Sequence, residues 1–159
     1  MITIGTQIPD VVLMTMTEDG PESVSSRAVL AGGKVVFFAV PGAFTPICSD
    51  YHLPGFVLRT DELRAKGVDS VACLSVNDVF VMDAWGKDQK VAGSVIMLAD
   101  GNGEFTRAMG LEMDGSTFGL GIRSQRYAAI IENGILTSLF VEPQGGLDVS
   151  SAESVLAAL

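Results

Sequence analysis

The fold of this chain is decided by the stretch Val35-Val36-Phe37-Phe38-Ala39-Val40-Pro41-Gly42-Ala43-Phe44-Thr45-Pro46-Ile47-Cys48. Residues 35–40 are apolar and end at Pro-Gly, which is typical of a strand buried on both faces. Thr45 and Pro46 predict a helix start, because Thr is a good N-cap and Pro is favoured at the first helical position. Cys48 is then the third helical residue, at the positive end of a helix dipole, where the reactive thiolate form of a cysteine is favoured.

Composition indicates one folded domain over residues 1–159. The chain is 48% hydrophobic and 18% charged, which supplies a substantial core. Its net charge of −9 argues against nucleic acid or an anionic membrane surface as a partner. The two cysteines, Cys48 and Cys73, are too few for a secreted disulfide framework, and the chain shows no signal peptide and no apolar run long enough to cross a bilayer. We therefore expect a cytoplasmic protein.

Hydrophobic runs and turn residues predict the elements that follow the opening stretch. A helix from Pro46 should kink or break at Pro54-Gly55 and stop at Lys66-Gly67. Asn77-Asp78 should cap a second helix, and Asn133-Gly134 predicts a type I′ hairpin between residues 127–132 and 135–141. Further strands are expected at residues 11–14, 34–40, 68–76 and 95–98.

Other segments give weaker signals. Residues 17–26 are polar and rich in turn residues, and Ser26 is a candidate cap for a short helix ending at Gly32-Gly33. Residues 104–121 are glycine-rich and predict one or two helical turns followed by a loop. Ser150 and Glu153 have capping-box spacing and predict a final helix over residues 151–159.

The resulting order is βαβαββα, an α/β core that resembles the thioredoxin-like fold, with an N-terminal extension and an insertion before the C-terminal hairpin. In that fold the strand at 35–40 lies between the parallel strand at 68–76 and an antiparallel strand that starts near Arg126. Because an antiparallel neighbour begins beside the end of its partner, we expect Arg126 to lie near the Pro41–Cys48 loop.

Several interpretations of the cysteines compete. Cys48 alone could be a buried core thiol, and no second cysteine stands at the C-x-x-C spacing. A zinc site built on Cys48 and His52 would need two more ligands, and only Cys73 and carboxylates remain. His52 could orient the loop but is more simply a satisfied helix histidine, and Cys73 is more simply a buried strand thiol.

Blocks spread along almost the whole chain carry a family resemblance. They are Pro41–Ser49, His52–Phe56, Lys66–Val68, Ala72–Asp78, Ala84–Gly86, Leu98–Asp100, Arg126–Ala128 and Val141–Pro143. In order, these blocks resemble the type II, or peroxiredoxin-five-like, group of peroxiredoxins. The resemblance implies a thiol-dependent peroxidase that reduces hydrogen peroxide and alkyl hydroperoxides and needs no cofactor or metal.

The resemblance also implies a role for each matching residue. Cys48 would be the peroxidatic cysteine, oxidised to a sulfenic acid by the hydroperoxide. Thr45 would hydrogen-bond the sulfur and the peroxide, and Arg126, with Arg123 as its rival or assistant, would stabilise the thiolate and polarise the O–O bond. Pro41 would shield the sulfur from water.

One departure from the family concerns how the sulfur is reduced again. Some relatives carry a resolving cysteine before the last helix, where this chain has Val149. A one-cysteine cycle is therefore expected, with glutathione and glutaredoxin or thioredoxin as the reductant, and with Cys73 as a less direct alternative. The family also implies a homodimer. A redox sensor that uses the same cysteine, and a thiol transferase, are the alternative functions.

Overall fold

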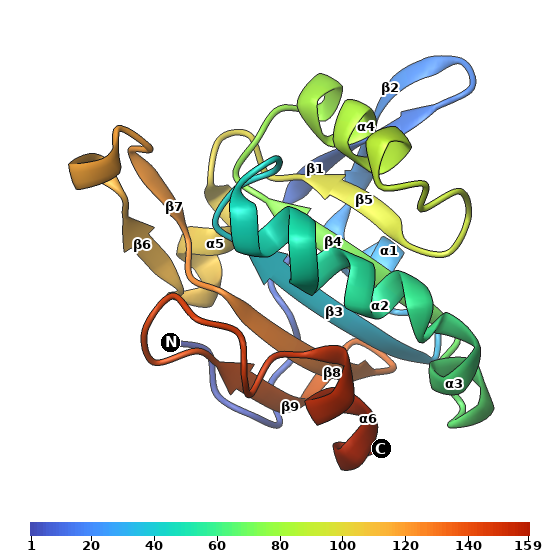
Figure 1. Cartoon of the computed structure of the whole chain (residues 1–159). Coiled ribbons are helices and arrows are strands. Elements are labelled where there is room, and N and C mark those ends of the chain that lie inside the picture. Colours follow the sequence, from blue (N-terminus) through green and yellow to red (C-terminus); the bar gives the residue numbers. More distant parts are fainter.

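The computed structural model describes residues 1–159 and contains a seven-stranded mixed sheet with helices on both faces (Figure 1). Its strands are β1 (Val12–Thr17), β2 (Gly20–Ser25), β3 (Lys34–Val40), β4 (Ser70–Ser75), β5 (Ile96–Ala99), β8 (Tyr127–Glu132) and β9 (Ile135–Val141). The helices are α1 (Ser26–Leu30), the π-helical turn η1 (Cys48–His52), α2 (Leu53–Leu58), α3 (Thr60–Ala65), α4 (Val79–Asp88), α5 (Glu104–Met109) and α6 (Ala152–Ala158). A separate pair, β6 (Glu112–Asp114) and β7 (Ile122–Ser124), flanks the short 3₁₀ turn η2 (Ser116–Phe118).

The strand order is β2-β1-β5-β4-β3-β8-β9, with β3, β4 and β5 parallel and the remaining pairs antiparallel. The predicted thioredoxin-like core is confirmed, since β3 lies between parallel β4 and antiparallel β8. Ala39 of β3 stands opposite Tyr127 of β8. The register therefore brings the residue before Tyr127 to the end of β3, where the 41–48 loop begins.

Alternate residues of β3 pack into two apolar cores, one on each face of the sheet. Val36, Phe38 and Val40 join a cluster with α2, α3, α4 and α6, whereas Val35 and Phe37 face α1 and α5. Both sets are fully buried, as expected of a central parallel strand covered on two sides. Figure 1 shows the same layering, with α2 and α4 in front of the sheet and α1 and α5 behind it.

Two antiparallel pairs depart from the sequence-based expectation. The polar segment after Thr17 forms β2, which pairs along its whole length with β1. The glycine-rich segment after α5 contains the β6–β7 pair as well as a helix and a turn. Both missed strands lie at exposed edges, where one strand needs no apolar face, so neither has a hydrophobic pattern to mark it.

The Asn133-Gly134 turn was predicted correctly. Both residues have positive φ, 52° and 80°, as a type I′ turn requires. The edge of the following strand β9 is partly covered by the N-terminal segment: Gly5 N–H donates to Leu136 O at 2.8 Å, and Leu136 N–H donates to Thr6 O at 2.9 Å. Residues 5–8 therefore act as a short extra strand along this edge.

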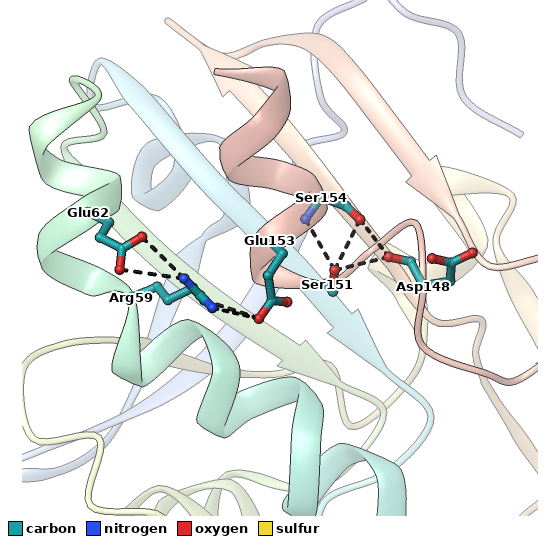
Figure 2. Close-up of polar contacts among 6 residues, drawn as sticks. All are labelled: Arg59, Glu62, Asp148, Ser151, Glu153 and Ser154. Atoms are coloured by element: carbon teal, nitrogen blue, oxygen red, sulfur yellow. Dashed lines mark hydrogen bonds and ion pairs between the residues drawn. The ribbon is translucent and has the colours of Figure 1, made fainter.

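Two predicted helix caps are wrong by one residue. The cap of α1 is Ser25, because the Ser26 hydroxyl instead donates to Pro9 O. The cap of α6 is Ser151, whose hydroxyl oxygen accepts from Ser154 N–H at 3.2 Å (Figure 2). The Ser150 hydroxyl points away from the helix, toward Glu142.

Helix α6 is held against the rest of this face by an ion-pair cluster. Figure 2 shows the Arg59 guanidinium between Glu62 of α3 and Glu153 of α6, with contacts of 3.3 and 2.9 Å. These side chains are exposed, so solvent screens the pairs and they contribute little to stability. They do fix where α6 and the loop before it sit relative to α2.

The expected break at Pro54-Gly55 is wrong in position. The helix runs through both residues, and the irregularity lies just before them, in the π turn η1, and just after them, at Arg59. In η1 the Leu53 N–H bonds to Cys48 O, one residue further back than in an α-helix. Because Pro54 has no N–H to donate, a widened turn ahead of it costs the helix less. None of the helices is long and apolar enough to span a membrane.

Candidate active site

Cys48 lies at the base of a loop on the front face of the sheet. The helix begins at Pro46, so Cys48 is its third residue, as predicted, and its sulfur is fully buried. The Ser49 N–H donates to Thr45 O at 2.9 Å and closes the first turn. Cys48 is therefore a thiol shielded from water at a helix start, the position that the sequence predicts for it.

Arg126 immediately precedes β8, and its guanidinium lies against this sulfur. Its Nη2 donates to Cys48 Sγ at 3.2 Å, and the residue is only 4% exposed. The expectation that strand geometry brings Arg126 to the Pro41–Cys48 loop is therefore confirmed. A guanidinium that donates to sulfur in a buried site stabilises a negative charge there more strongly than it would in water.

His52 orients the guanidinium. Arg126 Nη1 lies 3.0 Å from His52 Nδ1, and the opposite ring nitrogen, Nε2, lies 2.9 Å from Ser150 O. Arginine can only donate, so Nδ1 must accept, and the ring proton sits on Nε2 and is donated to the Ser150 carbonyl. Burial, and next the nearby charge of Arg126, lower the pKa of His52 to about 3, so the ring is neutral.

A carboxylate completes this arrangement. Glu142 Oε1 accepts from the Ser150 N–H and hydroxyl at 2.9 and 2.8 Å and from Asp148 N–H at 2.7 Å. Burial alone would raise the pKa of Glu142, but these bonds and the charge of Arg126 together lower it. The Glu142 N–H in turn donates to Arg126 O at 3.0 Å. Arg126, His52, Ser150 and Glu142 thus form a closed ring of hydrogen bonds around the back of the sulfur site.

The 41–45 loop is fixed by other bonds. Arg123 Nη1 donates to Pro41 O at 3.3 Å, so Arg123 holds the loop while Arg126 reaches the sulfur. Asn77 Oδ1 accepts from Ala43 N–H at 3.0 Å. The Thr45 hydroxyl donates to Gly42 O at 2.6 Å and makes no capping bond to the helix, so the interpretation of Thr45 as a side-chain N-cap is wrong.

The second cysteine is separate from this polar ring. Cys73 lies in the middle of β4, is fully buried, and is a free thiol like Cys48. Burial, and next the proximity of Cys48, raise the pKa of the Cys73 thiol well above its ordinary value. Cys73 is therefore held as the unreactive thiol form.

Sequence reasoning missed most of the supporting ring. His52 is the satisfied histidine that was expected, but its partner is the arginine at the sulfur, and a spacing of four residues from Cys48 on one helix was the available signal. Glu142 carried no signal beyond a matching block, and Ser150 was predicted only as a helix cap, because the proximity of both residues to His52 arises only in the folded chain. No group of three or more His, Cys, Asp or Glu side chains is placed to hold a metal ion.

A thioredoxin-like sheet that presents one buried cysteine to an arginine defines a thiol-dependent oxidoreductase. The chain matches the Redoxin family model over residues 3–156. It is 48% identical over 159 residues to peroxiredoxin-2D of Arabidopsis thaliana, covering 99% of this chain and 98% of the relative.

Solved structures agree with the sequence matches. Reduced Prx3 of Vibrio vulnificus in complex with H₂O₂ superposes with a TM-score of 0.95 at 52% identity, covering 99% of each chain. Peroxiredoxin 5 of Alvinella pompejana superposes with a TM-score of 0.87 at 35% identity, covering 99% of this chain and 97% of that one. The chain belongs to the peroxiredoxin family, in its type II, peroxiredoxin-five-like group, and is a thiol-dependent peroxidase.

Proposed function

We propose that Cys48 is the residue oxidised in each turnover and that the substrates are hydrogen peroxide and alkyl hydroperoxides. The Cys48 thiolate attacks the terminal peroxide oxygen, the O–O bond breaks, and the leaving oxygen takes a proton to become water or an alcohol. Cysteine gains that oxygen as a sulfenic acid. The observation that carries this proposal is the buried contact between Arg126 Nη2 and Cys48 Sγ, at 3.2 Å.

Each neighbour of the sulfur has a distinct part in this step. Arg126 donates to the sulfur and faces the charge that develops on the leaving oxygen, which is where fixed donors accelerate reactions most. The single proton of the Thr45 hydroxyl goes to Gly42 O, so its oxygen is left with lone pairs to accept the O–H of an incoming peroxide. Pro41, tied through its carbonyl to Arg123, shields the sulfur from water.

We further propose a one-cysteine cycle. Cys73 is buried within a strand between two neighbours, so bonding to the Cys48 sulfur would require the sheet to open. An external thiol must then attack the sulfenic acid, releasing water and forming a mixed disulfide that a second thiol resolves. Glutathione with glutaredoxin, or thioredoxin, would supply these thiols, and turnover measured with each system separately would identify the reductant.

The test of the chemical step follows peroxide consumption in the presence of a thiol reductant. Cys48→Ser should lose turnover, because serine provides no thiolate, whereas Cys73→Ser should keep near wild-type turnover. The second variant is a matched control, since it removes the same atom from an equally buried position. Continued turnover by Cys48→Ser would contradict the mechanism, and loss in Cys73→Ser would contradict the one-cysteine cycle.

We also propose that the protein is a homodimer joined near the active-site loops. Three exposed aromatic side chains support this: Phe44, Phe80 and Phe118, which are 52%, 64% and 83% exposed. Their segments are linked, because Asn77 bonds the 41–45 loop and Arg123 bonds Pro41. Aromatic residues gathered in this way are typical of a protein interface.

Sedimentation velocity tests the dimer. Phe118→Asp should give a monomer, because a charge would replace an exposed aromatic at the centre of the contact, while Leu58→Asp on α2 should leave the dimer intact. Leu58 is a matched control because it is equally exposed, at 83%. A wild-type protein that sediments as a monomer at micromolar concentration would contradict the proposal.

A cytoplasmic location is proposed on the state of the thiols. Both cysteines are unpaired, and a reducing compartment keeps such thiols free. Fractionation of the source cells with an antibody against the protein tests this location.

A further inference from the structure

A cavity of about 610 Å³ lies away from the sulfur site, between α4, the segment at residues 91–95, and the strands β1 and β5. None of Pro41, Thr45, Cys48 or Arg126 lines it. Its volume is in the range that holds a small organic ligand, about 300–1,000 Å³. The cavity is therefore large enough to be a binding site that the peroxidase reaction does not use.

Strands β1 and β5 make few backbone pairings with each other beside this cavity. Strands β1 and β5 pair at Met14 and Ala99, and beyond that pair the Thr15 hydroxyl, instead of a backbone group, donates to Met97 O at 3.0 Å. Both strands contribute side chains to the cavity, Met16 from one and Met97 from the other. The space thus comes from the way two strands diverge under α4.

The lining is apolar and adaptable. Met16, Met82 and Met97 supply unbranched thioether side chains, which adjust to the shape of a ligand. Gly86 lets the Met97 side chain pack closely against α4, since a Cβ there would lie 3.1 Å from Met97 Cγ and 3.3 Å from a Val91 methyl group. Most of the lining residues are hydrophobic, and this part of the lining suits a hydrocarbon chain.

The cavity mouth carries one unpaired cation. Asp83 and Lys87 also line the cavity, but they neutralise each other through a contact of 2.8 Å. Lys90, which lies two residues beyond the end of α4 and has φ +55°, makes no ion pair with any carboxylate. An unpaired lysine beside an apolar cavity complements a ligand with one negative head group, in a protein whose own net charge is −9.

We propose that this cavity binds a single-chain amphiphile with a carboxylate head, that is, a fatty acid of medium length. The chain lies among the three methionines and the carboxylate pairs with Lys90. The site is independent of the proposed peroxidase cycle, because binding involves no reaction at sulfur.

A native tryptophan can report ligand binding at this cavity. Trp85, the only tryptophan of the chain, lies on α4 between cavity residues Met82 and Gly86, and its Nε1 donates to Ser49 Oγ at 3.0 Å. A ligand that displaces α4 changes the surroundings of this indole. The fluorescence of Trp85 should therefore change on binding.

The experiment titrates the full chain with decanoate, below its micelle concentration, by calorimetry and by Trp85 fluorescence. Saturable one-to-one binding is expected, and decanol, which has the same chain length without the charge, should bind more weakly. Lys90→Glu should weaken decanoate binding about fivefold or more by reversing the charge at the mouth. Lys66→Glu makes the same charge change at an exposed site outside the cavity and should leave the affinity unchanged.

A second variant tests the apolar part of the cavity separately from the charge of Lys90. Ala92→Phe places a ring at the rim and should weaken decanoate and decanol equally, by about tenfold. Both substituted residues are exposed and make no contact with the sulfur site, so turnover of hydrogen peroxide serves as the check of folding. Absence of saturable decanoate binding, or binding that neither variant weakens, would overturn the proposal.

Discussion

Replacing His52 with leucine should loosen the arginine that faces the reactive sulfur. The change removes a charge-assisted bond with Arg126 and a neutral bond to Ser150 O, both buried. The first is worth about 1.5–3 kcal/mol and the second about 0.5–1.5 kcal/mol, so the free energy of unfolding should fall by about 2–4 kcal/mol. A domain of this size is stable by about 5–15 kcal/mol, so His52→Leu should still fold.

The activity of His52→Leu should fall further than its stability suggests. With Nη1 of Arg126 unbonded, the guanidinium can turn away from Cys48 Sγ. Misplacement of a catalytic group by about 1 Å can cost about 100-fold in rate, and we expect a loss of about 10- to 100-fold in the second-order rate constant for hydrogen peroxide. Stopped-flow measurement of peroxide reduction gives this constant directly.

The pH dependence provides the sharpest form of the test. The pKa of His52 is about 3 in the folded protein and 6.5 in the unfolded chain. Between these values the unfolded state binds more protons, so the contribution of His52 to stability is complete above pH 6.5 and is lost as the pH falls toward 3. The loss is at most about 1.4 kcal/mol per pH unit, so it is on the order of 2–3 kcal/mol by about pH 4.5.

Urea unfolding of both proteins across this range measures that loss. The difference in unfolding free energy between wild type and His52→Leu should shrink by roughly 2–3 kcal/mol from about pH 7 to about pH 4.5, because the leucine variant has no ring to protonate. The carboxylates titrate in both proteins, so their effect on the unfolding free energy cancels when the two proteins are compared. His52 is the only histidine, so its NMR titration can be read without assignment. A ring that titrates near its ordinary value, or a difference that stays constant with pH, would refute the reasoning.

Two further substitutions test the partners of His52. Arg126→Lys should slow peroxide reduction about 100-fold and slow alkylation of Cys48 by iodoacetamide, because lysine cannot reach the sulfur and the histidine at once; Arg123→Lys, which loses only a loop bond, should be affected far less. Glu142→Gln should lower the unfolding free energy at neutral pH by about 2 kcal/mol, since charged acceptors give the stronger bonds. Its deficit should shrink as the pH falls through the lowered pKa of Glu142, because the wild type loses the carboxylate there; an acid-independent deficit in denaturant melts would argue against the assigned bonds.

The central strands could be predicted from sequence because their signals are local and strong. Residues 35–40 are apolar without interruption and end at Pro-Gly, which is typical of a strand covered on both faces. Asn133-Gly134 supplies the two positive φ angles that a type I′ turn demands. The edge strands β2 and β6 could not be predicted, since an exposed edge imposes no apolar pattern. The helix caps were placed within one residue because neighbouring serines compete, and tertiary partners decided between Ser150 and Ser151.

The residues of the active site likewise fall into those that the sequence could predict and those that it could not. Cys48 and Arg126 were predictable because a helix start and a strand register place them in space. His52, Ser150 and Glu142 come together through burial and hydrogen bonding between segments far apart in sequence, and no local pattern encodes that. The hydroxyl of Thr45 had two expected uses, as a helix cap and as a donor to the sulfur and the peroxide, and its bond to Gly42 O is neither of them.

The short pairing of residues 5–8 along β9 affects whether further copies of this chain can pair with the edge of the sheet. An uncovered edge strand is a template on which further chains add by backbone bonding, and such growth has no natural end. Because Gly5 and Thr6 already occupy the backbone groups of Leu136, one rim of the sheet is closed to that route. Deleting residues 1–7, which spares the buried core residue Ile8, would uncover this edge, and association of chains through β9 is then the expected result.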